Sequence, residues 1–381
     1  MRGTESSVPA QGSLNSHDLA SNVSEFGFKV TFVGPVRETV PASHWRDFPA
    51  SLGGPFPPQN DLTEVSIMAG KKDPLIYAIG RARLTGPSSG VHRKKRCAEL
   101  FVQELRALGC GVQKWTNLSN KHVAQVVVRW QEKGLLPGTI KNYLTAVRDM
   151  CKAYGNDRIH PGNDAFGVER RVLVTNADKA VPQEVYARVV HALSASADRV
   201  RQHIGLTLEY QRVLGMRLEE ATKFNPLRDD LGDQAHIHRG AKGGRPRWLT
   251  LCNENQRELL DRAKASGFYA SPKETLIPRE MTESQWRDKV YAVISSLGLS
   301  RAACGASTHG LRHAYAQERY RLLTGFDAPA ACAGREEFLE QAITLGGENW
   351  REKDELARCA IREEMGHSAD RDIDKQYLGY Y

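Results

Sequence analysis

Residues 308–315 read Thr-His-Gly-Leu-Arg-His-Ala-Tyr, and this stretch decides what the second half of the chain is expected to be. On a helix, His309 and Arg312 lie one turn apart, so an imidazole and a guanidinium share a face. A guanidinium can hold two oxygens of one phosphate group. The stretch therefore predicts a phosphate-binding helix face, with His313 in a supporting position beside Arg312.

The same stretch also has the spacing of a metal site, because two histidines at positions i and i+4 of a helix can chelate zinc. His309 and His313 have this spacing, but no glutamate stands between them as in the His-Glu-x-x-His motif. A third ligand is not evident either. Phosphate contact is the preferred interpretation, and neither a metal ion nor another cofactor is predicted.

Two segments upstream carry cationic side chains that suit the same chemistry. Residues 215–220 read Gly-Met-Arg-Leu-Glu-Glu, in which Glu220 can support Arg217 across one helical turn. Residues 241–245 read Ala-Lys-Gly-Gly-Arg, a hairpin turn whose Lys242 could protonate a departing oxygen. Taken alone, the first segment is typical of a solvated helical charge pair and the second of a surface turn.

A histidine and a tyrosine near the C-terminus complete the set. Residues 366–368 read Gly-His-Ser, and Tyr377 follows His367 by ten positions. A phenol is a weak nucleophile at neutral pH because its pKa is about 10, but nearby cationic groups favour the phenolate. Tyr377 is the preferred nucleophile, while Tyr380 and Tyr381 remain open. All three could instead be an aromatic tail docked against the core.

In this order, the segments resemble the catalytic signature of tyrosine recombinases, the phage-integrase family. The resemblance implies DNA cleavage and rejoining through a 3′-phosphotyrosine intermediate, without metal or ATP. It implies that the residues acting on the scissile phosphate are Arg217, Lys242, His309, Arg312, His367 and Tyr377.

Two features depart from the family pattern. Arg312 and His367 are 55 positions apart, which is more than the family leads one to expect. The extra stretch, near residues 325–355, is expected to hold one or two inserted helices. Only four residues follow Tyr377, which is too few for a helix exchanged between protomers.

The positive charge of the chain is concentrated in one segment. Residues 91–160 hold thirteen Lys and Arg against five Asp and Glu, whereas the flanking parts are balanced and the total is +8. This is the pattern of a DNA-backbone binder, although a merely solvated helical face would look the same. The candidate DNA-contacting residues are Arg93, Lys94, Lys95, Arg96, Lys121, Lys141 and Arg148, together with Arg245 in the hairpin turn.

Periodicity predicts a mainly α-helical fold. Apolar stripes at helical spacing run through residues 97–108, 123–130 and 140–154, and such a bundle resembles the helical core-binding domain of the family. Residues 235–240 and 247–251 alternate like two strands of an edge hairpin. The predicted domains are a partly disordered N-terminal arm or small appended domain (1–89), a helical core-binding domain (90–178), and a mixed α/β, mostly helical catalytic domain with a small antiparallel sheet (179–381).

Composition excludes several classes of protein. No apolar run approaches the roughly 20 residues that span a bilayer, and seven cysteines without a Cys-x-x-Cys pair argue against a disulfide framework. The sequence therefore predicts a cytoplasmic, nucleoid-associated protein with no membrane partner. The preferred function is the integrase of a phage or mobile element, a tetramer on double-stranded DNA with DNA-bending or directionality factors as candidate accessory partners. The alternatives are a type IB topoisomerase and a non-catalytic DNA-binding regulator.

Overall fold

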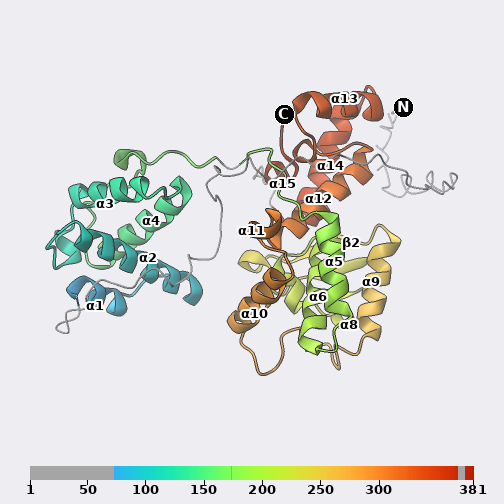
Figure 1. The fold of residues 1–381 in the computed structure, drawn as a ribbon, viewed down its shortest axis with the longest axis horizontal. Helices are drawn as coiled ribbons and strands as arrows, with labels where there is room; N and C mark the ends of the chain where they lie inside the picture. The colour runs from blue at the N-terminus through green and yellow to red at the C-terminus, as the bar shows by residue number, and fades with distance from the viewer. Residues whose placement is uncertain (1–72, 173, 368–373) are drawn as a thin grey trace, which may run out of the picture. The chain divides into compact units, whose positions relative to one another are not determined.

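The computed structural model describes residues 73–172, 174–367 and 374–381 (Figure 1). Most of the N-terminal arm or domain predicted for residues 1–89 therefore lies outside the described residues. The described helices form two groups with separate hydrophobic cores. We call them the helical unit, residues 73–168, and the C-terminal unit, the described residues from 174 onward.

The helical unit is the group of helices coloured blue to green in Figure 1. Its elements are α1 (Pro74–Arg81), α2 (Ser88–Ala107), a 3-10 turn (Trp115–Asn117), α3 (Asn120–Glu132), α4 (Pro137–Ala153) and a second 3-10 turn (Asp164–Phe166). The three predicted apolar stripes face its core, where Phe101 packs against Trp115 and Trp130. Leu108, expected in the first stripe, is exposed because α2 ends at Ala107.

The helical unit begins earlier than the boundary predicted at residue 90. Leu75 and Ile79 of α1 are buried in the same core as α2 to α4. The indole of Trp115 donates a hydrogen bond of 3.2 Å to the Leu75 carbonyl, which fastens α1 to the unit. A helix of two turns shows too few apolar positions for its period to be read from the sequence.

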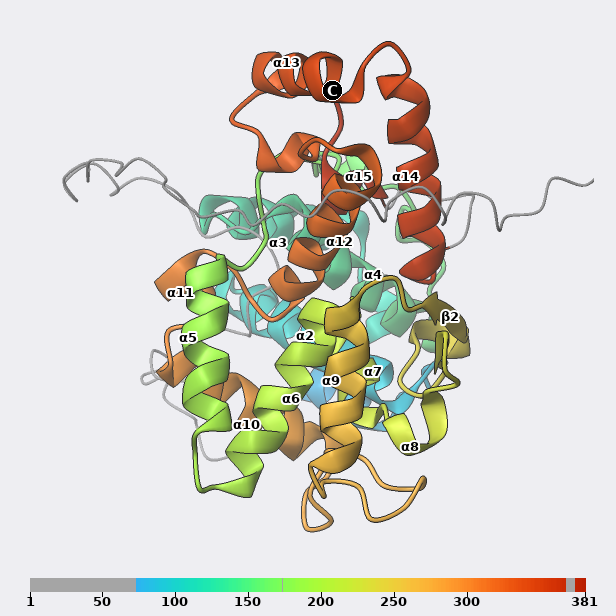
Figure 2. The ribbon, with the colours of Figure 1, turned by 90° about the vertical axis from the view of Figure 1, so that its right-hand side faces the viewer.

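The C-terminal unit contains the remaining helices and the hairpin. Its helices are α5 (Gln183–Ser194), α6 (Arg199–Val213), α7 (Leu218–Lys223), α8 (Pro226–Asp229), α9 (Glu254–Ala265), α10 (Glu283–Ser296), α11 (Arg301–Cys304), α12 (His309–Thr324), α13 (Arg335–Gly346), α14 (Trp350–Glu364) and α15 (Asp374–Leu378). Helix α6 packs against α5, α9 and α12 (Figure 2). Helix α12 in turn packs against α14 and α15. Helix α12 is therefore the element around which the unit is assembled.

The predicted hairpin is present. Strands β1 (Gln234–Ile237) and β2 (Arg247–Thr250) pair antiparallel, with Ala235 opposite Leu249. Both of these side chains are buried, while Trp248, which precedes Leu249 and pairs with His236, points to the other face and is exposed. A 3-10 turn at Lys242–Gly244 joins the strands. The alternation in and out of the core fixes the register, because a slip of one residue would reverse the faces.

The stretch predicted as an insertion contains α13 and the start of α14. Phe338 of α13 packs against Phe326 and Trp350, so this helix belongs to the core of the C-terminal unit. The predicted fold class, mainly α with a small antiparallel sheet, is confirmed. Within the described ranges, no helix is long and apolar enough to cross a membrane.

Candidate active site

Arg312 is the centre of the site. It lies on α12 and is completely buried, and its guanidinium donates hydrogen bonds to the backbone carbonyls of Gly215 and Met365. Its Nε lies 3.3 Å from the hydroxyl of Tyr377, and its Nη2 lies 3.4 Å from Nε2 of His367. One side chain thus joins segments that are far apart in the sequence.

A buried carboxylate holds three arginines together. Glu220 is fully buried, and its oxygens lie 2.6 Å from Arg217 Nη1, 2.7 Å from Arg247 Nη1 and 3.8 Å from Arg312 Nη1. Burial alone would raise the pKa of Glu220, but the three guanidinium charges lower it to about 2. We call these four residues the arginine cluster. Three positive charges surround one negative charge, so the cluster attracts an anion.

Arg217 is the member of the cluster that reaches solvent. It caps the start of α7, where its backbone N–H donates to Glu220 Oε2 at 2.8 Å. Its side chain is 20% exposed, against 4% for Arg247 and 0% for Arg312. An arriving phosphate would therefore meet Arg217 first.

Arg247 is a member of the cluster that the sequence interpretation missed. It starts β2, and its Nε donates to the Glu364 carbonyl at 2.8 Å. Burial lowers its pKa to about 10, although the charge of Glu220 acts in the opposite direction. The sequence did contain a signal for this role. Arg247 and Leu249 occupy the inward face of a predicted strand and alternate with residues on the exposed face. An arginine at such a position needs a buried partner.

Tyr377 is the C-terminal tyrosine that meets the cluster. Its ring is 5% exposed and packs against the imidazoles of His309, His313 and His367, with ring centroids 5.6, 4.6 and 5.8 Å away. Its hydroxyl lies 3.4 Å from His309 Nε2.

The two other C-terminal tyrosines lie outside this arrangement. Tyr380 and Tyr381 are 55% and 37% exposed. The ring of Tyr381 lies 6.0 Å from that of Phe338, so it docks on α13 as an aromatic tail would. Tyr377 alone of the three combines burial with contact to the cluster.

The three histidines are buried beside positive charge. Burial lowers the pKa of His309 to about 4 and those of His313 and His367 to about 3, and Arg312 acts in the same direction on each. The rings of His309 and His313 meet edge to face at 5.3 Å. Among the described residues, no group of three or more His, Cys, Asp or Glu side chains could hold a metal ion. At neutral pH these imidazoles are uncharged acceptors or donors.

We expect the protein to lose stability as the pH falls below neutrality. Below the ordinary histidine pKa of 6.5 the unfolded chain binds protons, whereas folded His309 and His313 stay neutral until about pH 4 and 3. The urea midpoint should therefore be lower at about pH 5 than at about pH 7.5. A His313→Asn variant should lose part of this dependence. An identical midpoint at both pH values would contradict the buried, neutral state.

Gly215 allows the cluster to form. Its φ is +59°, and a Cβ there would lie 2.4 Å from the ring of Tyr315, yet its carbonyl accepts from both Arg312 and Arg247. We expect Gly215→Ala to lower the free energy of unfolding by about 3 kcal/mol, from backbone strain and overpacking together. Gly244→Ala is the matched control, because its φ is +69° with nothing within 4 Å. It should lose only about 1 kcal/mol, and equal losses in urea denaturation would refute the role of Gly215.

Lys242 and Arg245 lie at the tip of the hairpin and are exposed. The charge of Lys242 contributes to the lowered pKa of His309, so the hairpin tip is close to the site. Arg245, Arg247 and His367 help to line a cavity of about 540 Å³ beside the cluster. The structure thus places Arg245 at the edge of the site, and the charge of Lys242 acts on His309 within it.

The predicted DNA contacts of the helical unit differ in their surroundings. Those with exposed side chains include Arg93, Lys121 and Lys141. The others have partners nearby: Lys94 pairs with Asp149 at 2.7 Å, Arg96 with Glu99 at 3.2 Å, and Lys95 donates to the Gly80 carbonyl at 2.8 Å. Exposed ion pairs of this kind are weak and can be exchanged for a phosphate. These assignments stay predictions.

Arg148, the remaining predicted DNA contact of the helical unit, makes its hydrogen bonds inside that unit, and its assignment also stays a prediction. All three guanidinium nitrogens donate inside the helical unit, to the carbonyls of His160 (2.8 Å) and Gly162 (3.0 Å) and to Asn163 Oδ1 (2.8 Å). It fastens the turn after α4 to that helix. A basic residue between apolar stripes can satisfy a nearby turn as well as a phosphate.

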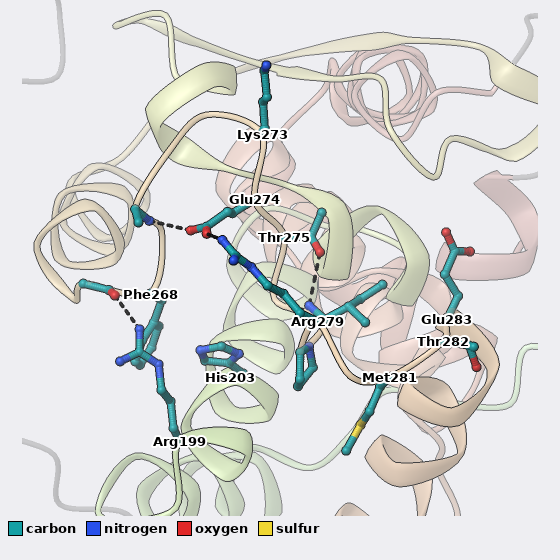
Figure 3. A pocket seen from close by; sticks show the side chains of 14 residues that line it. Arg199, His203, Phe268, Lys273, Glu274, Thr275, Arg279, Met281, Thr282 and Glu283 are labelled. Atoms are coloured by element: carbon teal, nitrogen blue, oxygen red, sulfur yellow. Dashed lines mark hydrogen bonds and ion pairs between the residues drawn. The ribbon is translucent and has the colours of Figure 1, made fainter.

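A second cavity, of about 680 Å³, lies between the start of α6 and the loop before α10 (Figure 3). Both of its arginines are already engaged: Arg199 donates to the Gly267 carbonyl and stacks on Phe268, and Arg279 pairs with Glu274 at 2.8 Å. None of its lining residues belongs to the arginine cluster. The candidate site is therefore the cluster, not this cavity.

Several solved structures are similar to the chain at low sequence identity. The Tn1549 transposon integrase in complex with circular intermediate DNA is 12% identical, with a TM-score of 0.49 over 80% of this chain and 95% of that one. A lambda integrase dimer bound to a COC′ core site is 13% identical, with a TM-score of 0.45 over 74% and 88%. The XerH recombinase bound to palindromic difH substrate is 15% identical, with a TM-score of 0.43 over 80% and 89%.

Two sequence models of protein families match the chain. The model described as phage integrase, N-terminal, matches residues 79–160, and the model described as integrase matches residues 169–318. The second match includes Arg217, Lys242, His309 and Arg312 and ends before His367 and Tyr377. No curated protein sequence matches the chain significantly. The two matches together span more than half of the chain, which belongs to the phage-integrase family, the tyrosine recombinases.

Proposed function

We propose that this protein is a site-specific DNA recombinase that cleaves and rejoins double-stranded DNA through a 3′-phosphotyrosine intermediate. The observation that supports it most is the position of the Tyr377 hydroxyl, between Arg312 Nε and His309 Nε2 at 3.3 and 3.4 Å. A nucleophile, a phosphate-binding guanidinium and a neutral proton acceptor meet there. Family membership supports the same reaction.

Residues of the site can supply and accept every proton that the proposed cleavage step requires. The Tyr377 oxygen attacks phosphorus, and its proton passes to a neutral imidazole, for which His309 is nearest. The bond from phosphorus to the 5′-oxygen breaks, and Lys242 supplies a proton to that oxygen. Arg217 and Arg312 stabilise the extra negative charge of the pentacoordinate state. The freed 5′-hydroxyl of another strand then reverses the step, and no ATP is consumed.

The assembly on DNA is part of the proposal. Exchanging strands between two sites requires two cleavages at each site, so four protomers act on double-stranded DNA. The helical unit supplies a basic surface, with Arg93, Lys121 and Lys141 as its exposed candidates. We assign the protein to a phage or another mobile element as its integrase, with DNA-bending or directionality factors as accessory partners.

A nicked suicide substrate tests the reaction. Duplexes taken from the DNA that flanks the gene, nicked so that the cleaved 5′ end diffuses away, should give an SDS-resistant adduct without divalent metal. The adduct should be lost in Tyr377→Phe and kept in the matched control Tyr380→Phe. Persistence of the adduct in Tyr377→Phe would sink the assignment of the nucleophile.

Two other outcomes would favour the remaining candidates. Relaxation of an arbitrary supercoiled plasmid by dilute protein would indicate a type IB topoisomerase, since no paired site is then required. Salt-sensitive DNA binding without any adduct would indicate a non-catalytic regulator.

A further inference from the structure

The segment between the two units contains an unusual backbone position. Residues 169–182 lead from the helical unit to α5, and Asn176 lies in this segment with φ +50°. It is the one non-glycine with positive φ in the part of the chain that the structure describes. Asparagine tolerates this region better than most residues. Something in the surroundings must still hold it there.

The side chain of Asn176 grips the backbone of the C-terminal tail. Its Nδ2 donates to the Tyr380 carbonyl at 2.7 Å, and its Oδ1 accepts from the Tyr380 N–H at 2.8 Å. A carboxamide presents the same donor and acceptor as a peptide group. Both backbone groups of one residue are therefore satisfied by one side chain, as in a single rung of a β-ladder.

The tail is packed closely between this grip and Tyr377. Leu378 is fully buried. Gly379 has φ +75°, and a Cβ there would lie 2.8 Å from the Ala330 nitrogen and 2.9 Å from Asn176 Oδ1. The Gly379 carbonyl also accepts from Arg358 at 3.0 Å. A displacement of Tyr380 would thus be felt at Tyr377, three residues earlier.

Helix α15 depends on such contacts for its orientation. It has five residues, Asp374–Leu378, and a helix this short is not stable alone. Its direction, and with it the direction of the Tyr377 hydroxyl, must come from the helices packed against it, α12 and α14, and from the contacts of the residues that follow it.

We propose that Asn176 is a positioning residue that fixes Tyr377 for attack by clamping the tail to the segment between the units. The proposal rests on the proposed role of Tyr377 as nucleophile. It adds a function to the stretch around Asn176: one carboxamide holds the backbone of Tyr380, three residues after the nucleophile. Asn176 touches neither the phosphate nor the arginine cluster.

Three variants distinguish the effect of the Asn176 side-chain hydrogen bonds from the effect of its positive φ. Asn176→Gly keeps access to positive φ but removes the carboxamide. Asn176→Asp keeps the acceptor for the Tyr380 N–H but places a charge against the Tyr380 carbonyl. Thr175→Ala alters the exposed neighbouring side chain and serves as the control.

Three measurements on the full-length protein are needed for each variant. Hydrogen exchange of the Tyr380 amide reports the clamp without DNA. Equilibrium binding to an uncut duplex reports affinity, and single-turnover adduct formation on the suicide substrate reports the chemistry. For Asn176→Gly we expect faster exchange, affinity within about twofold of wild type, and adduct formation slowed by about 10- to 100-fold, the scale of a misplaced reacting group. Asn176→Asp should fall between, and Thr175→Ala should match wild type.

A purely structural role predicts a different pattern. If Asn176 only secured the chain end, Asn176→Gly would exchange faster at Tyr380 and still form the adduct at the wild-type rate, which would overturn the proposal. Equal losses of affinity and rate would overturn it too, because the defect would then not be specific to the chemical step. A wild-type protein that forms no adduct would instead refute the proposed function, and unchanged exchange in Asn176→Gly would refute the clamp alone.

Discussion

Arg312→Met is expected to slow formation of the covalent adduct by about 10²- to 10³-fold, the usual effect of removing one donor aimed at a developing negative charge. Methionine fills much of the same space without charge. The Tyr377 hydroxyl would lose its guanidinium neighbour, and the carbonyls of Gly215 and Met365 would lose buried donors. Each orphaned carbonyl should lower the free energy of unfolding by about 1–3 kcal/mol.

The matched control lies on the same helix. Arg319→Met removes an arginine that pairs with Glu364 at 2.8 Å and does not contact Tyr377. We expect it to reduce stability but to change the adduct rate of the folded fraction by less than about tenfold. The measurement is a single-turnover time course at saturating protein, with the folded fraction determined by circular dichroism. A nearly wild-type rate in Arg312→Met would remove this residue from the mechanism.

Glu220→Gln is expected to give a large loss of stability. The change leaves Arg217, Arg247 and Arg312 facing one another without their shared carboxylate. Breaking a buried ion pair from one side lowers the free energy of unfolding by about 3–5 kcal/mol. Guanidinium chloride denaturation at pH 7 measures the change. Glu219→Gln, next along the chain and paired with Lys223 on the surface, should change stability by less than about 1 kcal/mol.

The same carboxylate gives a signed pH dependence. Because the pKa of Glu220 is lowered from 4.5 to about 2 in the folded chain, its contribution is complete above about pH 4.5 and is lost as the pH falls through 2. Glu220→Gln should lack this acid-sensitive component. Sulfate should recover part of the variant's stability at pH 7, since an anion that binds only the folded state stabilises it. A loss below about 1 kcal/mol would show that the carboxylate does not hold the cluster.

Periodic elements of the fold could be predicted from the sequence because their signals are local. The stripes of α2, α3 and α4 repeat over several turns, and the hairpin alternates around a glycine turn, so both appear where they were expected. Helix α1 was placed outside the helical domain because its membership depends on Trp115 and on other residues far along the chain. Long-range packing of this kind leaves no period to read.

The candidate site was partly predictable because its motifs are also local signals in the sequence. The motifs supplied Arg217, His309, Arg312, His367 and Tyr377, and the structure gathers these five side chains around the buried carboxylate or beside the Tyr377 ring.

The sequence could not show which arginines belong to the site and which support the fold elsewhere. Arg247 completes the cluster although no motif marks it, and Arg148 fastens a turn although it lies in the most basic segment. Both outcomes depend on the partner that burial brings to each guanidinium. Asn176 belongs to the same group, since its partner is 204 positions away.

Arg312 donates hydrogen bonds to the carbonyls of Gly215 and Met365, so replacing it removes structural support as well as a catalytic group. This dual role affects which inactive variant suits crystallography of an uncut DNA complex. A random-mutagenesis screen for lost recombination would recover Arg312 variants. Some of these would be inactive because they misfold and aggregate, and others would be folded but unable to cleave DNA. Tyr377 contributes a ring to packing and only its oxygen to chemistry, so phenylalanine should leave the architecture intact. Tyr377→Phe is therefore the protein to crystallise.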